Sequence, residues 1–408
     1  MSQTTSLKRR LTLPLLILYG LGVTIGAGIY VLVGETAAKA GLYAPVSFLV
    51  AATVVAFTGF SYAELSTRFP VSAGEAAYVK EGTGSGKLAL IVGLLVIASG
   101  VISSATVSLG AAAYLQTLFP ISEYVLIAVV VLLVALIAIW GILESVSLAA
   151  LITLAEIGGL ALVIYFGFSL KPDLLSEINS VIPPFSLYAW SGIFAAGLLA
   201  FFAFIGFEDM ANVAEEVKDP HRNMPLGILF TLIIATFIYF VVVSVAVLSV
   251  PMTELSTSSA PLALLFRDAS PSVAGFFSIV AFFATLNGAL IQVIMASRVL
   301  YGLGKQGHLP EFFSRVNPLT GTPVQATFII ALTILGLAWF FPLGGLAEMT
   351  SAIVLTVFIT VNIALIRLKW TGTKNPEQHV FQVPIWVPIC GAITCLTLLA
   401  ARLIQLVV

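Results

Sequence analysis

The sequence predicts an all-α polytopic membrane protein made of two five-span halves of opposite orientation, followed by one further span. The first observation is composition, since 60% of the 408 residues are hydrophobic and only 9% are charged. No water-soluble domain of this size needs such a balance for its core. The second observation is a series of eleven apolar runs, each about 20 residues or longer. The third is a pair of glycine-containing interruptions, one in the first span of each half.

The apolar runs fall into groups of five, five and one. Residues 1–170 form the expected first inverted repeat and residues 188–369 the second, while residues 381–408 hold an additional C-terminal span. Two of the runs exceed the thickness of a membrane, so tilted helices are expected there. The expected spans are 13–38, 43–68, 88–118, 121–143 and 147–170, then 188–213, 225–250, 272–303, 323–342 and 346–368, and finally 383–406.

The positions of the basic residues predict the orientation. With the N-terminus inside, 14 of the 18 Lys and Arg residues fall on the cytoplasmic side, and an odd number of spans then places the C-terminus outside. The first apolar run follows Arg10 without a small-residue cleavage site, so it is expected to remain as span 1. The expected location is the plasma or inner cell membrane, with membrane lipid around the chain.

Two loops have helical character of their own. Residues 70–86 are expected to hold a short cytoplasmic surface helix before a Gly/Ser hinge. In residues 251–270, Thr253 or Ser259 is expected to cap a short helix that lies over the protein. For both loops, a passive connector is the alternative.

The first interruption lies in residues 18–34, LYGLGVTIGAGIYVLVG, which carry five glycines. Each interior glycine costs a helix roughly 1 kcal/mol relative to alanine, so Ile25, Gly26, Ala27 and Gly28 are predicted to separate half-helices at 13–24 and 29–38. The free N–H groups of Gly26, Ala27 and Gly28 would then form an anion site made of backbone. Close packing between neighbouring spans is the alternative explanation of these glycines.

The second interruption lies in span 6, whose apolar part ends early at Phe207. Glu208 and Asp209 follow at a depth where an acid costs about 2.5–3.5 kcal/mol. We predict a second broken helix, with unpaired carbonyls from Phe202 to Ile205 and a bend at Gly206. Paired interruptions in inverted halves indicate a transporter site at mid-membrane. Carbonyls suit an ammonium and amides suit a carboxylate, and an α-amino acid carries both groups.

Four segments resemble the amino acid/polyamine/organocation (APC) superfamily of permeases, and the resemblance covers essentially the whole chain. They are GVTIGAGIY in span 1, FAFIGFEDMANVAEEVKDPHRNMPLGI across span 6, ASRVLYGLGKQGHLP after span 8 and FQVPIWVPI at span 11. The resemblance implies a LeuT-like five-plus-five inverted-repeat fold with discontinuous helices 1 and 6. Many members of the superfamily have twelve spans, whereas eleven are predicted here.

The resemblance also implies contacts with the substrate. The carboxylate would meet the amides of Ala27 and Gly28, the ammonium would meet carbonyls of spans 1 and 6, and the side chain would meet residues of span 8. Phe202, Phe204 and Phe207 include a candidate aromatic gate, although core packing is the alternative. The expected substrate-binding residues are Thr24, Ile25, Gly26, Ala27, Gly28, Phe202, Ala203, Phe204, Ile205, Gly206, Gln292 and Met295, with the ammonium on the carbonyls of Thr24, Phe202 and Ile205.

Two acids are candidates for coupling or gating. Glu156 occupies a position in span 5 where proton-coupled relatives often carry a lysine, and an acid inside a span is a functional candidate by default. It is expected to carry a proton, and a hydrogen-bonded clamp between helices is the alternative. Glu208 is expected to act as a gate or conformational sensor, and the alternative is a cap on the second half of helix 6.

The function that these features predict is secondary active transport of amino acids by alternating access, with proton-coupled or exchange-type energetics. Neutral aliphatic substrates are favoured because no acid is assigned to the side-chain half of the pocket. A cationic amino acid or polyamine transporter or exchanger, and a passive facilitator, are the alternatives.

The sequence contains no catalytic or nucleotide-binding motif, so no enzyme activity, cofactor, metal or nucleic acid is expected. No cysteine lies between spans 3 and 4, so no disulfide-linked accessory subunit is expected.

Overall fold

The computed structural model describes residues 9, 11–26, 28–69, 74–140, 146–305, 307, 309–372 and 380–407. These residues are almost entirely helical. The helices of the first half are α1 (Leu13–Ile25), α2 (Gly28–Ala40), η1 (Gly41–Tyr43), α3 (Ala44–Arg68), α4 (Gly74–Thr83), α5 (Gly86–Gln116), α6 (Glu123–Trp140) and α7 (Val146–Leu170). Then follow η2 (Pro172–Val181), α8 (Leu187–Phe202), η3 (Phe207–Glu216), α9 (Pro220–Ser249), α10 (Met252–Leu255), η4 (Pro261–Phe266), α11 (Pro271–Lys305), η5 (Glu311–Ser314), α12 (Val324–Phe340), α13 (Leu343–Trp370) and α14 (Trp386–Val407).

The helices match the expected spans, and spans 1 and 6 are each in two pieces. Span 1 consists of α1 and α2, and span 6 consists of α8 and the 3₁₀ helix η3. Within the described residues, eight helical segments are long and apolar enough to cross a membrane, and α1, α12 and the first part of α14 are shorter apolar helices. The protein is therefore a multi-pass membrane protein with discontinuous helices 1 and 6.

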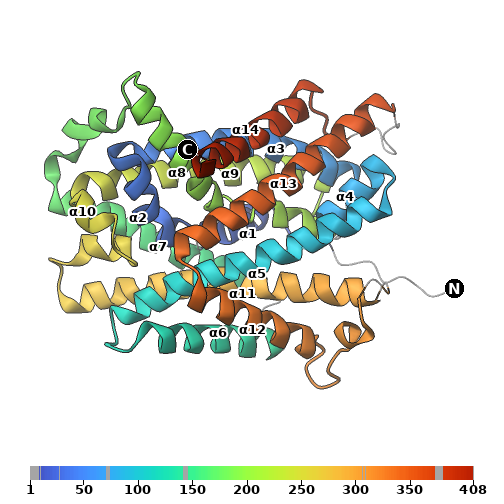
Figure 1. The fold of residues 1–408 in the computed structure, drawn as a ribbon, viewed down its shortest axis with the longest axis horizontal. Coiled ribbons are helices and arrows are strands. Elements are labelled where there is room, and N and C mark those ends of the chain that lie inside the picture. The colour runs from blue at the N-terminus through green and yellow to red at the C-terminus, as the bar shows by residue number, and fades with distance from the viewer. Residues whose placement is uncertain are drawn as a thin grey trace.

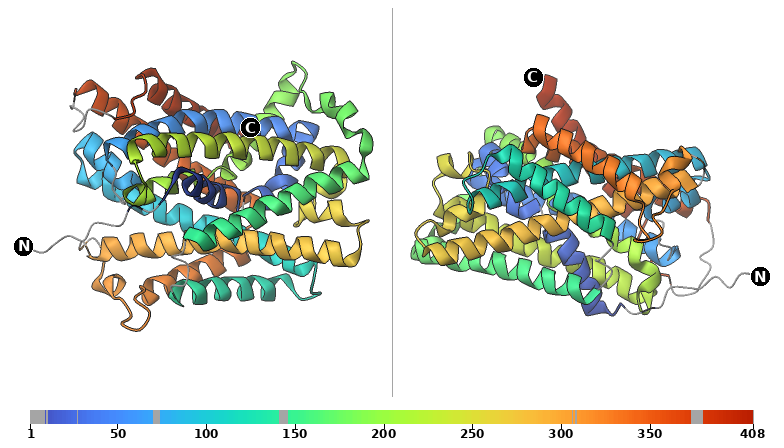
Figure 2. Two further views of the ribbon diagram at one scale, coloured as in Figure 1. Left: turned by 180° about the vertical axis from the view of Figure 1, so that it is seen from behind. Right: turned by 90° about the horizontal axis from the view of Figure 1, so that it is seen from below.

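The first broken helix packs against helices of both halves. Helix α1 lies between α9 and α7 (Figure 2), and α2 packs against α8. The two longest helices, α5 with 31 residues and α11 with 35, lie side by side along the bundle (Figure 1). At a rise of 1.5 Å per residue they are about 46 and 52 Å long, well beyond the roughly 30 Å of a hydrocarbon core. We call the end of the bundle that carries α4 the α4 face, and the opposite end, which carries α10, the α10 face.

The loop between α3 and α5 differs from the surface helix that the sequence predicts. It does form the helix α4, but α4 packs against α13 and α5. Glu75, Tyr78 and Val79 on this helix are buried. The local sequence is polar enough for a solvated helix, and only the packing against α13 reveals that one face is covered.

The loop before α11 contains the short helices α10 and η4. The expected caps are wrong, because Pro251 and Ala260 precede these helices and neither helix start has a side-chain cap. A nearby hydroxyl, that of Ser258, instead accepts a hydrogen bond from the Ala260 N–H at 3.2 Å. Helix α10 thus starts at Met252, before Thr253, and η4 starts at Pro261, two residues after Ser259.

A buried carboxylate ties three helices together at the α4 face. Glu64 on α3 accepts hydrogen bonds from Arg68, at 2.5 Å, and from Lys369 on α13, at 2.8 Å. Its second oxygen accepts the backbone N–H of Val383, which precedes α14, at 2.8 Å. The Glu64 side chain has no exposed surface. Arg68 lies four residues after Glu64 on the same helix, a spacing that favours an ion pair, whereas Lys369 and Val383 reach Glu64 only through the fold.

We expect Glu64→Ala to destabilise the protein by about 3–5 kcal/mol, because it leaves buried cations without their counter-charge. The measurement is the free energy of unfolding, or the thermal midpoint, of the purified protein in detergent. Glu254→Ala is the matched control, since Glu254 also pairs with an arginine at 2.5 Å but is about half exposed, so a loss of about 1 kcal/mol or less is expected. Equal losses in the two variants would contradict a buried clamp.

Candidate functional site

The breaks in helices 1 and 6 lie directly against each other. A Cβ atom placed on Gly28, the first residue of α2, would lie 2.3 Å from the Cα of Ala203 in the break of span 6. A Cβ atom on Gly206 would lie 2.7 Å from the carbonyl oxygen of Val23 on α1. Such distances leave no room for any side chain, so glycine is required at both positions for the two backbones to touch.

The bend in span 6 occurs where the sequence predicts it. Helix α8 ends at Phe202, and Gly206 has a φ of +119°, which side-chain-bearing residues rarely adopt. The N–H of Gly206 donates to Oε2 of Glu208 at 2.9 Å. Glu208 thus bonds the backbone of its own turn, as the capping alternative requires.

The structure corrects the expected backbone groups of the first break. The Gly26 N–H donates to the Gly22 carbonyl at 3.2 Å, so this amide continues α1 and is not free for an anion. Gly28 opens α2, and the first N–H groups of a helix have no acceptor within it. Ala27 lies outside the described residues. The first-turn amides of α2 are therefore the remaining backbone donors at this break.

A tyrosine on α9 occupies the carbonyls that the sequence leaves unpaired. The Tyr239 hydroxyl lies 2.8 Å from the carbonyl oxygen of Thr24 and 2.7 Å from that of Ala203, so it can donate to either break. The Phe202 carbonyl accepts the N–H of Ile205 at 3.1 Å. The expectation of unpaired carbonyls is thus wrong for Phe202, while the carbonyls of Thr24 and Ala203 share the single hydrogen of one hydroxyl. Sequence reasoning missed Tyr239 because it lies in an uninterrupted apolar span.

Glu156 on α7 lies beside the first break. Its Oε1 accepts a hydrogen bond from Asn287 of α11 at 3.1 Å, and a Cβ atom placed on Gly26 would lie 3.4 Å from the same oxygen. The Tyr30 hydroxyl donates to the Glu156 backbone carbonyl at 2.6 Å. Among the described residues, the buried Oε2 of Glu156 and the buried hydroxyl of Thr24 have no hydrogen-bond partner. Two polar groups without partners therefore flank the break.

The residues expected to contact the side chain of the substrate line a small cavity next to the second break. Ile205, Gln292 and Met295 share this cavity with Glu208. Its volume is about 20 Å³, far below the roughly 300–1,000 Å³ of typical ligand pockets. A molecule the size of an amino acid could therefore enter only if the helices moved apart. The lining includes two further acids that the sequence did not assign to the pocket, Glu75 of α4 and Asp209 of η3.

The aromatic residues around the second break are packed in the core. Phe204 lies against Tyr239 with ring centroids 5.0 Å apart, and Phe207 lies between Tyr62 and Phe358 at 5.7 and 5.5 Å. Phe202, Ile25 and Ala203 are buried as well. These contacts are those of the core-packing alternative for the phenylalanines.

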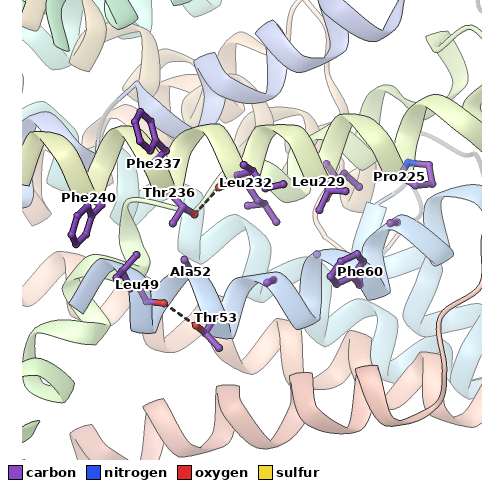
Figure 3. A pocket seen from close by; sticks show the side chains of 15 residues that line it. Leu49, Ala52, Thr53, Phe60, Pro225, Leu229, Leu232, Thr236, Phe237 and Phe240 are labelled. Carbon is purple, nitrogen blue, oxygen red and sulfur yellow. Dashed lines mark hydrogen bonds between the residues drawn. The ribbon is translucent and has the colours of Figure 1, made fainter. Parts of the chain in front are cut away.

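Two larger hollows lie away from the breaks. An apolar groove of about 540 Å³ runs between α3 and α9 (Figure 3), and its residues Ile233 and Phe237 are more than half exposed on the outside of the bundle. A second hollow of about 380 Å³ opens between α6, α12 and α13 toward the α10 face and includes Glu35 and Glu123. Neither contains a residue of the two breaks.

The arrangement of the site defines a class of protein. Two broken helices touch inside a helical bundle, and unpaired backbone and side-chain groups surround the contact. This is the architecture of secondary transporters that bind their substrate at mid-membrane.

Comparison with known proteins gives the family. Residues 11–408 match the amino acid permease family, and the chain belongs to it. The methylthioribose transporter of Bacillus subtilis is 31% identical over 97% of this chain and 88% of its own length. The branched-chain amino acid permease BcaP of the same organism is 29% identical over 96% and 87%. A vacuolar cationic amino acid transporter of Arabidopsis thaliana is 30% identical over 89% of this chain and 64% of its own length.

A solved structure has the same fold. A mutant of the manganese transporter of Eremococcus coleocola aligns with 96% of this chain and 86% of its own, with a TM-score of 0.67 and 14% sequence identity. This likeness confirms the LeuT-like fold. At this identity it carries no information about the substrate.

The contact between the breaks predicts opposite effects of an alanine at Gly206 and at Gly158. Gly206→Ala should destabilise the protein by about 1–3 kcal/mol because of its positive φ alone, and the clash with Val23 adds to this loss. Gly158→Ala on α7 should stabilise it by about 0.5–1 kcal/mol, since nothing lies within 4 Å of the added Cβ. Thermal unfolding in detergent measures both variants. If Gly206→Ala melts at the temperature of Gly158→Ala, the close contact between the breaks does not exist.

Proposed function

We propose that this protein moves amino acids across the cell membrane by alternating access, and that the substrate is held where the breaks of helices 1 and 6 meet. The observation that carries the proposal is the contact of Gly28 with Ala203, flanked by the unpartnered Thr24 hydroxyl and Glu156 carboxyl oxygen. The α2 amides suit a carboxylate. Carbonyls of the second break suit an ammonium once Tyr239 releases them. Membership of the amino acid permease family supports the same substrate class.

Two kinds of side chain are candidates for the substrate. Neutral aliphatic side chains suit the apolar lining of the cavity by Val354, Val357 and Phe358. Cationic side chains suit the acids Glu75, Glu208 and Asp209 in the same lining. Among the relatives, one is named for branched-chain and another for cationic amino acids, so both candidates have a precedent in the family.

We expect proteoliposomes that contain the protein to accumulate amino acids against a gradient when an inward proton gradient or a trans amino acid is supplied. A panel of radiolabelled amino acids, with and without proton and sodium gradients, is the measurement. Uptake that stops at equilibration and ignores ionophores would identify a passive facilitator. Uptake driven by sodium alone would contradict proton-coupled or exchange-type transport, and no uptake of any amino acid would overturn the proposed function.

Glu156 is proposed to carry the coupling proton. An acid with one hydrogen-bonded and one unpartnered oxygen can change its protonation as the two faces open in turn. The competing role is a clamp, in which the hydrogen bond to Asn287 merely joins α7 to α11.

Glu156→Gln separates the two roles, because glutamine still accepts the Asn287 hydrogen bond but cannot ionise. We expect this variant to bind substrate and to catalyse exchange while its net uptake no longer responds to external pH. Glu177→Gln, at a half-exposed carboxyl in η2, should keep the full pH profile. If Glu156→Gln also keeps it, the residue is a clamp.

The α4 face is proposed to be cytoplasmic, with the N-terminus inside. The basic residues Lys80, Lys218, Arg222, Arg315 and Lys369 belong to loops or helix ends on that side of the predicted topology. A membrane-impermeant thiol reagent should not label Asn223→Cys from outside sealed right-side-out vesicles, and should label it after lysis. External labelling would reverse the orientation.

A further inference from the structure

Three carboxyl groups line the cavity next to the second break. Glu75 comes from α4, and Glu208 and Asp209 come from η3, more than 130 residues later in the chain. Their exposed fractions are only 7%, 8% and 6%. A group of buried acids is costly in a membrane protein unless something compensates its charge.

The partners of these acids carry no positive charge. The Tyr62 hydroxyl donates to Glu75 at 3.2 Å, the Gly206 N–H donates to Glu208 at 2.9 Å, and the Asn212 amide donates to Asp209 Oδ1 at 3.4 Å. Within the described part of the chain, none of the three acids forms an ion pair. Glu64, an equally buried acid on α3, contacts both an arginine and a lysine, so this bundle does supply cations where an acid is structural.

Like charges that line one small cavity oppose one another's ionisation. Burial is the main cause that raises the pKa of the Glu75 carboxyl above its ordinary value, and hydrogen bonds from its own backbone and from Tyr62 offset this only in part. A cation placed among the three groups would favour the ionised forms again. The cavity is therefore suited to a positively charged group and poorly suited to an anion.

One buried polar atom at the cavity, Oδ2 of Asp209, has no partner among the described residues. The side chain of Gln292 on α11, which is 7% exposed, lines the same cavity. Both a carboxylate oxygen and an amide oxygen can accept from a hydrogen-bond donor that enters the cavity.

The cavity adjoins the substrate position. Ile205, the last residue before the bend, is part of its lining, and Met295 lies one helical turn from Gln292. A substrate held by its α-carboxylate and α-ammonium at the two breaks would reach this cavity with its side chain alone.

We propose that the carboxyls of Glu75, Glu208 and Asp209, with the Gln292 amide, bind the ammonium or guanidinium at the end of a cationic amino acid side chain. This inference rests on the proposed function, because it uses the breaks to hold the α-carbon groups. The cavity widens when the helices separate, and the bound cation then replaces the missing counter-charge. Neutral side chains of the same length leave the acids without that partner.

The first test uses the unmodified protein and substrate pairs matched in length. Binding of arginine is compared with citrulline, and binding of lysine with 2-aminoheptanoic acid, by competition against a radiolabelled amino acid in detergent. We expect the charged member of each pair to bind about tenfold or more tightly, as for hydrogen bonds to charged groups. Equal or tighter binding of citrulline and 2-aminoheptanoic acid would overturn the inference while leaving amino acid transport intact. Absence of binding by every amino acid would instead overturn the proposed function.

The second test uses isosteric variants. Asp209→Asn and Glu75→Gln should each reduce the arginine-to-citrulline affinity ratio about tenfold, since each removes one negative charge with little change of shape. Glu81→Gln is the matched control, because Glu81 lies on the same helix as Glu75 but is exposed. Thermal unfolding in detergent identifies a variant that fails to fold. In that case the comparison of charged and neutral substrates on the unmodified protein tests the proposal. A folded variant that keeps the wild-type ratio contradicts a role for its acid.

Discussion

The structure depends on how an apolar bundle satisfies the backbone of two broken helices. Inside a membrane, each unpaired carbonyl or N–H group costs several kcal/mol, so a helix can break only where another polar group is at hand. The Tyr239 hydroxyl is that group, because it lies within 2.8 Å of the carbonyls of both Thr24 and Ala203. A hydroxyl has one hydrogen to donate. It therefore serves one carbonyl at a time, and the break holds a backbone acceptor that a substrate ammonium can claim.

The polar groups of the bundle fall into two kinds, and the division separates support from function. Glu64 is satisfied by Arg68, Lys369 and a backbone N–H, and it joins α3 to α13 and to the start of α14. Near the breaks, the Glu156 and Asp209 carboxyls each keep one oxygen without a partner. Buried groups of the second kind reduce stability. Their presence beside the two breaks is explained if a bound substrate or proton supplies the missing hydrogen bond.

The two breaks are also tied to each other outside the site. Leu11, just before α1, pairs with Val217, just after η3, and its N–H and C=O bond Glu216 and Lys218. Helix α4 begins at Gly74 against Asn212 of η3. Any separation of the broken helices at the α4 face must therefore carry α4 and the segment before α1 with it, so these contacts couple the site to that face.

The sequence by itself determined the number and order of the spans, the two breaks and an acid inside span 5. These features follow from local composition, since apolar length sets a span and Gly26, Gly28 and Gly206 weaken a helix wherever it lies. Only the tertiary structure decided which backbone groups at the breaks are free. The Gly26 amide continues α1, and the Thr24 carbonyl shares with the Ala203 carbonyl the hydroxyl of a tyrosine more than 200 residues away.

The same holds for the acids around the cavity. In the sequence, Glu75 lies in a polar loop and Asp209 lies at the end of a span. They meet because α4 folds back under η3 and packs against α13. The charge of a pocket depends on side chains from several helices, and their meeting is set by packing between segments far apart in the chain, which no local pattern encodes.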